Sequence, residues 1–389
     1  MILVTGTTEK TGRKFVMDKS SICVSHKHDP QLGLVRPIQT STAYFYIDED
    51  KQPYPRYFNT PNQEAVAAKI AKLEGAEAGL VFSSGMAAIS GGIMPFVKPG
   101  DHVILLRDLY GGTHSFVTRE FAKWGIEYDF ASSDLNEFET LIRPTTRLIY
   151  VETPTNPCLG ILDLKSLATL TKSKDILTVI DNTFATPINQ NPIKLGIDLV
   201  IHSGTKYLGG HSDLSCGAVV GESRHMDAVL ANARNYGGTL NPASCHLLER
   251  SLQTLDVRVQ RQNSNALAVA QFLEASEQIG NVLYPGLPSH PQHQMAARQM
   301  SGFGGMIAFE LADGLDVTNF LRALRVATPA MSLGGVETTL TIPALTSHKL
   351  MPEADRQSCG VTENMVRFST GIESAQDLIE YLEQALAGL

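Results

Sequence analysis

Short apolar runs alternate with segments of helical periodicity through much of the chain. Four of these runs cover residues 102–106, 147–152, 176–181 and 197–202, and they are rich in β-branched side chains. Because the runs lack a polar face, they are typical of strands that are buried on both sides of a parallel sheet. Strands that alternate with helices in this way predict an α/β fold with a mostly parallel sheet.

The pattern differs at both ends of the chain. Residues 1–60 contain several prolines and no sustained helical period, so we expect an irregular arm there. A helix is predicted after the arm at residues 63–75, ending at Gly75. The other predicted elements are one long helix or a broken pair at 243–276, strands at 304–311 and 366–372, and a closing helix at 374–388.

The change in pattern also suggests how the chain is divided. Its 389 residues exceed one ordinary core and fit two packed domains. We therefore expect an N-terminal arm over 1–60, a large α/β domain over 61–260 and a smaller α+β C-terminal domain over 261–389.

Composition narrows the class of function. The net charge is −8 and no block of like charges occurs, which argues against nucleic acid or an anionic membrane as a partner. No apolar run is long enough for a transmembrane helix, and the first residues lack the apolar core of a secretory signal. The five cysteines are scattered without a CxxC pair, as in proteins of a reducing compartment. We expect a cytoplasmic protein with a small-molecule substrate.

Two polar residues stand at the ends of predicted strands, where α/β proteins bind ligands. Asp181 ends the third run, and Lys206 follows the fourth in the segment HSGTKYLGGHSD. An aspartate after a strand is often only a turn residue. A lysine between hydroxyl residues and glycines is less ordinary, and desolvation there would suit a Schiff-base lysine. A carboxylate that faces the ring nitrogen of pyridoxal phosphate (PLP) keeps that nitrogen protonated, so the pair predicts a PLP site.

Three further segments offer groups that a PLP site needs. VFSSGMAAIS (81–90) predicts a strand, a turn at Gly85 and a helix, whose N-terminus would favour a phosphate, although an ordinary strand–turn–helix junction is the alternative. Tyr110 follows the first run and could stack on a ring and transfer protons, or be a packed surface residue. Asn156 lies between two prolines and could donate to a phenolate oxygen, or be a turn residue.

Together these motifs resemble those of a known family. The strings SSGMAAI, YGGTH, ETPTNP, DNTFATP, HSGTKYLGGHSD, YPGLPSHPQH and RFSTGIE are similar to segments of the Cys/Met-metabolism family of fold-type-I PLP enzymes. That family includes cystathionine γ- and β-lyases, cystathionine γ-synthases, methionine γ-lyases and O-acetylhomoserine sulfhydrylases. The resemblance implies a fold-type-I, PLP transferase-like architecture in which the large domain binds the cofactor.

The resemblance also implies roles for individual residues. Lys206 is expected to bind PLP covalently, and Tyr110 to stack on the ring and take part in proton transfer. Asp181 would face the ring nitrogen and Asn156 the phenolic oxygen. The phosphate ligands that the resemblance implies are Gly85, Met86, Ser203 and Thr205. The substrate-binding residues that it implies are Arg367, which suits the α-carboxylate, with Ser332, Asn156 and Glu152 nearby.

The resemblance gives the N-terminal arm a task. Tyr54 and Arg56 are similar to a Tyr-x-Arg pair that reaches the phosphate of the neighbouring subunit in relatives. This implies an active dimer, usually paired into a tetramer. The sequence departs from the family pattern next to the pair, with Phe58 in place of glycine and one extra residue in 59–62.

The reaction that the resemblance implies is cleavage of a carbon–sulfur bond in a sulfur amino acid, which yields a 2-oxo acid, ammonia and a thiol. A γ-replacement reaction on an activated homoserine is the alternative, and a non-catalytic α/β binding protein is a remote one. Two positions bear on the substrate and point in different directions. Met331 is apolar, as in methionine γ-lyases, where cystathionine γ-lyases and γ-synthases are often acidic. Gly112, however, stands where methionine γ-lyases often carry cysteine.

No metal site is expected. His202 and His211 lie near Lys206, and His26 and His28 lie in the arm, but their spacing matches no common zinc pattern. Packing or hydrogen bonding explains them better.

Overall fold

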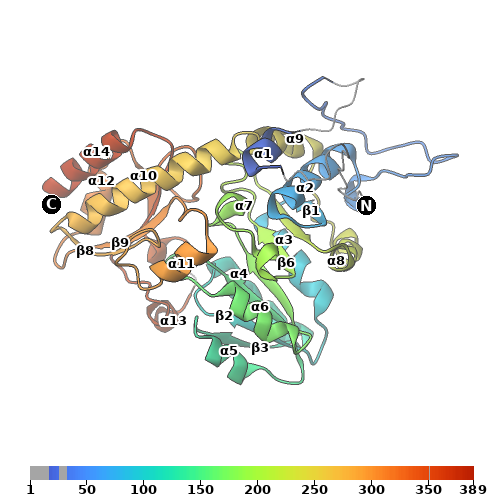
Figure 1. The fold of residues 1–389 in the computed structure, drawn as a ribbon, viewed down its shortest axis with the longest axis horizontal. Helices are drawn as coiled ribbons and strands as arrows, with labels where there is room; N and C mark the ends of the chain where they lie inside the picture. The colour runs from blue at the N-terminus through green and yellow to red at the C-terminus, as the bar shows by residue number, and fades with distance from the viewer. Residues whose placement is uncertain (1–16, 26–32, 350) are drawn as a thin grey trace, which may run out of the picture.

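The computed structural model describes residues 17–25, 33–349 and 351–389, and its central feature is a sheet with helices on both faces (Figure 1). The described residues form a seven-stranded sheet in the order β1-β7-β6-β5-β4-β2-β3. Neighbouring strands are parallel except at β7, which is antiparallel to β1 and β6. The bounds are β1 Ala78–Phe82, β2 His102–Leu106, β3 Glu127–Ala131, β4 Thr146–Glu152, β5 Leu177–Asp181, β6 Leu199–His202 and β7 Gly217–Gly221.

The four apolar runs form β2, β4, β5 and β6, so the predicted α/β fold with a mostly parallel sheet is confirmed. Successive side chains of β5 show why the runs lack a polar face: Val179 is buried in the core on one face and Ile180 in the core on the other. Helices α3, α4 and α8 contribute to the first core, and α2, α5 and α6 to the second. Their bounds are α2 Pro61–Glu74, α3 Gly85–Ile93, α4 Gly111–Glu120, α5 Leu135–Leu141, α6 Leu164–Lys172 and α8 Ser223–Tyr236.

The last third of the chain forms a second, smaller α+β unit. Its described strands make a five-stranded sheet in the order β10-β11-β12-β9-β8. Helices α10 and α14 pack with this sheet in one hydrophobic core. The bounds are β8 Ile279–Leu283, α11 His293–Gln299, β9 Met306–Leu311, α12 Val317–Ala323, β10 Thr328–Pro329, β11 Thr339–Thr341, α13 Glu353–Ser358, β12 Met365–Ser369 and α14 Ala375–Ala387.

The helical region 243–276 is a broken pair, one of the two forms expected. Helix α9 covers Pro242–Leu252, and the long helix α10 covers Leu255–Ala275. Figure 1 shows α10 running from the central sheet to the smaller unit. Val259 packs in the core of the large sheet and Val269 in the core of the small one. The division at residue 260 stays a prediction, since it falls inside a helix that serves both cores.

The described part of the N-terminal arm contains an α-helix that its sequence does not signal. Helix α1, Lys19–Val24, buries Ile22 and Cys23 next to α2 and α10. Its six residues are too few to show a helical period. Residues 33–54 form no helix or strand, and Figure 1 shows this segment extending away from the rest of the chain. Over the described residues, no helix is long and apolar enough to cross a membrane.

Candidate active site

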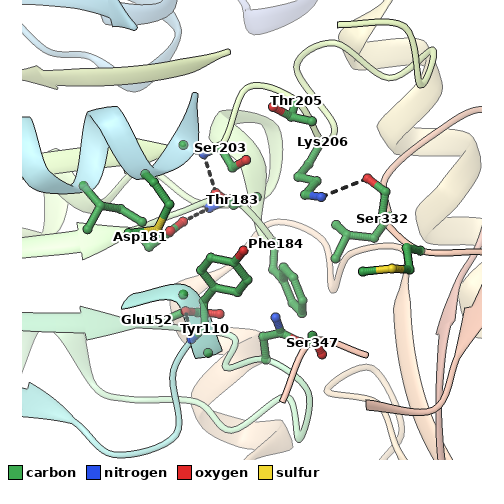
Figure 2. A pocket seen from close by; sticks show the side chains of 18 of the residues that line it. Tyr110, Glu152, Asp181, Thr183, Phe184, Ser203, Thr205, Lys206, Ser332 and Ser347 are labelled. Carbon is green, nitrogen blue, oxygen red and sulfur yellow. Dashed lines mark hydrogen bonds between the residues drawn. The ribbon is translucent and has the colours of Figure 1, made fainter. Parts of the chain in front are cut away.

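A cavity of about 540 Å³ lies where the two units meet. The carboxyl ends of β4, β5 and β6 and the first turns of α3 and α4 form its inner side, and β11, β12 and residues 331–333 close the opposite side (Figure 2). All the predicted cofactor and substrate residues line this cavity except Tyr54 and Arg56. Those that line it are Gly85, Met86, Tyr110, Glu152, Asn156, Asp181, Ser203, Thr205, Lys206, Ser332 and Arg367.

Asp181 is the last residue of β5 and lies at the base of the cavity. Its Oδ1 accepts a hydrogen bond of 2.9 Å from the backbone N–H of Thr183, and the side chain is almost fully buried. Burial raises the pKa of this carboxyl group above its ordinary value. The ionised form therefore gains from a cation placed opposite it, such as a protonated ring nitrogen.

Lys206 follows β6 in a tight turn, in which its own N–H donates to the Ser203 carbonyl at 3.1 Å. Its Nζ donates to Ser332 Oγ at 2.8 Å. Burial, with a smaller contribution from the charge of Arg367, lowers the pKa of Lys206 to about 8. A substantial fraction of the amine is therefore neutral near physiological pH, which is the form that attacks a carbonyl carbon.

The first turn of α3 offers donors for an anion. Ser84 caps the helix, and its side chain accepts from the Ala87 N–H at 3.1 Å. The N–H groups of Gly85 and Met86 precede the first intrahelical bond, so the helix leaves them for a ligand. A Cβ on Gly85 would lie 2.8 Å from Ser203 Oγ, which shows how closely the two segments approach. The Thr205 hydroxyl is less available, because it donates to the Cys216 carbonyl at 3.1 Å.

Tyr110 caps α4, and its backbone N–H donates to Glu152 Oε2 at 2.9 Å. Figure 2 shows its ring within the cavity, with the hydroxyl directed toward the side where Lys206 lies. A Cβ on Gly112 would collide with this ring, so the glycine fits the observed position of Tyr110. Burial, together with the nearby charge of Asp181, raises the pKa of Glu152 well above its usual range.

Arg367, in β12, joins the two units across the cavity. Its Nη1 donates to Asn156 Oδ1 at 3.0 Å, and its Nη2 donates to the Ser332 carbonyl at 3.2 Å. Its Nε is buried and has no hydrogen-bond partner among the residues that the structure describes. Burial lowers the pKa of Arg367 to about 10, so the guanidinium remains charged at neutral pH. A buried cation with a spare donor suits a carboxylate ligand.

Ser332 has a backbone conformation that fits a functional position. Its φ is 81°, in the region that non-glycine residues seldom adopt. In this conformation the Ser332 hydroxyl accepts a hydrogen bond from Lys206 Nζ and the Ser332 carbonyl accepts one from Arg367 Nη2. The neighbouring Met331 side chain lines the cavity and is largely exposed.

Tyr54 and Arg56 lie away from this cavity, near the end of α8. Arg56 Nη1 donates to the Arg234 carbonyl at 2.6 Å, and its guanidinium lies 5.1 Å from the ring centre of Tyr57. Their contact with a neighbouring subunit stays a prediction.

Some residues that line the cavity are not predicted from the sequence patterns. Thr183 and Phe184 lie two and three residues after Asp181, and this position just past a strand end is a usable signal. Thr341, Ser347 and Met351 come from the smaller unit. No local pattern marks them, because only the packing of the two units brings them to the cavity.

The histidines near Lys206 have protein partners. His202 Nε2 lies 2.7 Å from Glu74 Oε1, and His211 Nδ1 lies 2.7 Å from the Gly209 carbonyl. Across the described ranges, no group of three His, Cys, Asp or Glu residues is arranged to hold a metal. His26 and His28 lie outside these ranges.

The cavity fits PLP in its charges and donors. The buried carboxyl of Asp181 gains from a cationic ring nitrogen, the first turn of α3 suits a phosphate, and the lowered pKa of Lys206 suits attack on an aldehyde. These features define a PLP-dependent enzyme of α/β architecture.

The chain belongs to the Cys/Met metabolism PLP-dependent enzyme family, whose profile matches residues 20–387. It is 42% identical to the cystathionine beta-lyase of Lactococcus lactis subsp. cremoris (strain MG1363), over 84% of this chain and 86% of that protein. It is 40% identical to the cystathionine gamma-synthase of Mycobacterium leprae (strain TN), over 94% of this chain and 95% of that protein. A crystal structure of cystathionine gamma-lyase from Lactobacillus plantarum complexed with L-serine is similar, with a TM-score of 0.92, 36% identity and coverage of 95% and 99%.

Membership of this family makes the chain a PLP-dependent enzyme that acts on sulfur amino acids. The fold-type-I architecture inferred from the motifs is confirmed by the structural similarity.

Proposed function

We propose that this enzyme cleaves a carbon–sulfur bond of an amino acid and releases a thiol, a 2-oxo acid and ammonia. The observation that carries the proposal is that Lys206, with its lowered pKa, and the charged Arg367 face one cavity from two units. The Lys206 amine can accept a proton from the substrate while the Arg367 guanidinium holds the substrate's carboxylate. The names of the relatives support this choice, since two of them are cystathionine lyases.

The proposed cofactor contacts follow from the position of each group. Lys206 attaches PLP covalently, Asp181 holds the proton on the ring nitrogen, and the Asn156 amide faces the phenolic oxygen. The Tyr110 ring stacks on the cofactor ring. The phosphate ligands proposed are Gly85, Met86, Ser203 and Thr205. When bound, PLP supplies an electron sink that stabilises negative charge on the substrate Cα.

The proposed substrate contacts place the reacting atoms next to Lys206. Arg367 binds the α-carboxylate through its Nε and its two Nη groups, beside Ser332 and Asn156. Glu152 supports this site through the backbone of Tyr110. The Lys206 amine takes the proton from Cα. For γ-elimination it would first return that proton to the cofactor-bound substrate, and as a neutral amine again it would take a second proton from Cβ. The Tyr110 hydroxyl protonates the departing sulfur.

We further propose that the active unit is a dimer, paired into a tetramer, and that the enzyme is cytoplasmic. The arm supports the dimer because its apolar side chains are exposed in the single chain: Phe45 is 90% exposed and Tyr46 67%. In the proposed dimer, Tyr54 and Arg56 bind the phosphate in the neighbouring subunit. Five cysteines, all among the described residues and none in a disulfide, fit a reducing compartment.

A γ-replacement reaction is the second candidate. It is favoured by the similarity to the cystathionine gamma-synthase of M. leprae. Both reactions need the same carboxylate and proton-transfer groups, so the cavity residues serve either one.

A substrate panel tests the proposal. Cystathionine, methionine, cysteine, homocysteine and O-acetylhomoserine are each supplied, with 2-oxo acid and thiol measured together. Equal release of both from a sulfur amino acid, lost in Lys206→Ala by at least about a thousandfold, is the expected result. Parental turnover by Lys206→Ala would contradict the mechanism. A thioether product formed only when a thiol accompanies O-acetylhomoserine would establish replacement instead.

A further inference from the structure

A network of buried polar side chains lies behind the cavity floor, on the opposite face of the central sheet. Its centre is Glu74, the last residue of α2, whose side chain is fully buried. Glu74 Oε1 lies 2.7 Å from His202 Nε2 and accepts a hydrogen bond of 2.8 Å from Asn182 Nδ2. Asn191 Nδ2 donates to the other carboxylate oxygen at 3.3 Å. One carboxylate thus receives groups that come from β6, β5 and the segment after α7 (Thr186–Asn189).

The network continues to a third strand end. Gln190 Nε2 donates to Asn182 Oδ1 at 2.9 Å and to the Thr153 carbonyl at 3.0 Å. Thr153 directly follows β4, Asn182 directly follows β5, and His202 is the last residue of β6. The three strand ends that carry the predicted cofactor residues are therefore tied together through side chains.

The three members at the strand ends, Thr153, Asn182 and His202, are each next in sequence to a cavity residue. Asn182 follows Asp181, and His202 precedes Ser203 in the turn that carries Lys206. Because successive side chains in a strand point to opposite faces, the cavity residues face the cofactor side while their neighbours face Glu74. Movement of the network would therefore shift the backbone of Asp181 and of the Lys206 turn.

Stability alone does not account for this arrangement. Burying a carboxylate costs free energy, and apolar side chains of similar volume are often at least as stabilising. A network whose members are all satisfied instead makes the local structure rigid. Asp181 and Lys206 must contact the same cofactor ring from two different strands, so their spacing has to be fixed.

We propose that Glu74 is a positioning residue that sets the spacing of Asp181 and Lys206 by joining the ends of β5 and β6. Glu74 touches neither cofactor nor substrate, and it acts through Asn182 and His202. This inference rests on the roles proposed for Asp181 and Lys206.

The test is the variant Glu74→Ala, studied as the PLP-loaded enzyme. We expect the dissociation constant of PLP to rise about tenfold and the absorption band of the bound cofactor to change. The kcat should fall by about ten- to a hundredfold while KM changes less than about threefold, since misplaced groups slow the reaction and Arg367 still binds the substrate. Glu74→Gln keeps the length of the side chain and an oxygen that can accept from Asn182 and His202. It should restore each quantity to within about threefold of the parent.

The matched control is Asp198→Asn, at the other end of the same two strands. Asp198 Oδ2 accepts from the Thr178 N–H at 2.8 Å and from the Thr178 hydroxyl at 2.7 Å, so it also links β5 to the chain entering β6. This variant should lower thermal stability and leave PLP affinity, absorption and kcat as in the parent. Equal losses in Asp198→Asn and Glu74→Ala would overturn the proposal, because they would indicate general destabilisation. Parental values in folded Glu74→Ala would also overturn it.

Two further variants complete the test. If Glu74→Ala yields no folded protein, Asn182→Ala takes its place, since it cuts the link between Glu74 and the end of β5 while His202 and Asn191 still contact the Glu74 carboxylate. A loss of about threefold in PLP affinity is then expected, and a parental value would overturn the proposal. Lys206→Ala tests the proposed PLP site separately from the positioning role of Glu74. Retention of covalently bound PLP in Lys206→Ala would refute the proposed site, whereas parental behaviour of Glu74→Ala alone would refute only the positioning.

Discussion

Lys206 lies in surroundings that disfavour its charge. The side chain is desolvated and Arg367 adds a second positive charge. Within the described part of the chain, Nζ donates to the Ser332 hydroxyl and not to a carboxylate. Desolvation of the ammonium form and repulsion from a like charge both lower the pKa of a lysine. The neighbours of Lys206 therefore lower the pKa of its amine before any ligand binds.

The pH dependence of cofactor capture tests this state of Lys206. Its pKa of about 8 in the folded chain lies below the ordinary value of 10.5, so the reactive neutral amine increases as pH rises through 8. The rate at which PLP-free protein binds PLP covalently should rise roughly tenfold between pH 7 and 9, then level off. Stopped-flow absorbance measures this rate, with Lys206→Ala as the blank. A rate that still climbs steeply between pH 9 and 10 would show that the pKa is not lowered.

Helix α4 illustrates how an element sets the position of a site residue. Tyr110 is its N-cap, and the first turn that follows begins with Gly111 and Gly112. A side chain at Gly112 would meet the Tyr110 ring. The glycine therefore determines where the ring can lie.

The variant Gly112→Ala should displace the Tyr110 ring and lower kcat by about tenfold, since a misplaced catalytic group slows the reaction. A double-mutant cycle with Tyr110→Ala checks the cause. If the methyl group acts through the ring, the double variant should be no slower than Tyr110→Ala alone. Additive losses in the cycle would mean that Gly112 acts by another route.

The sequence reveals an element when its local pattern is strong. Strands β2, β4, β5 and β6 are predictable because both of their faces are buried and the centre of each run is apolar on both faces. Helix α1 was not, since six residues carry too little periodicity. The same distinction holds in the cavity. Asp181 and Lys206 were found from strand ends, whereas Thr341 and Ser347 reach it only through the packing of two units.

Arg367 can be predicted as a substrate ligand only from the resemblance to the family and not from its local sequence pattern. It lies within a fully buried strand of the smaller unit, far along the chain from Asn156, and its local pattern marks no ligand site. The contact between the two residues joins the units across the cavity. The substrate carboxylate is thus expected to bind at a junction that neither unit forms alone.

The whole molecule is expected to work as an assembly, because the single chain leaves the arm exposed and holds Arg56 outside its own cavity. If Arg56 serves the neighbouring subunit, one complete site requires Lys206 from one copy and Arg56 from another. Two variants that are each inactive, Lys206→Ala and Arg56→Ala, would then complement each other when subunits are exchanged.

Mixing tests this sharing of sites directly. The two variants are unfolded together in equal amounts, refolded with PLP and assayed for thiol release. Half of the resulting dimers should be mixed, and each mixed dimer should hold one site with both native residues, so activity should return to about a quarter of the parental value. If Arg56 acted within its own chain, every site would lack one of the two residues, and the mixture would stay as inactive as either variant alone. Mixing Lys206→Ala with Arg367→Ala is the control that should stay inactive, because both residues line the cavity of the same chain.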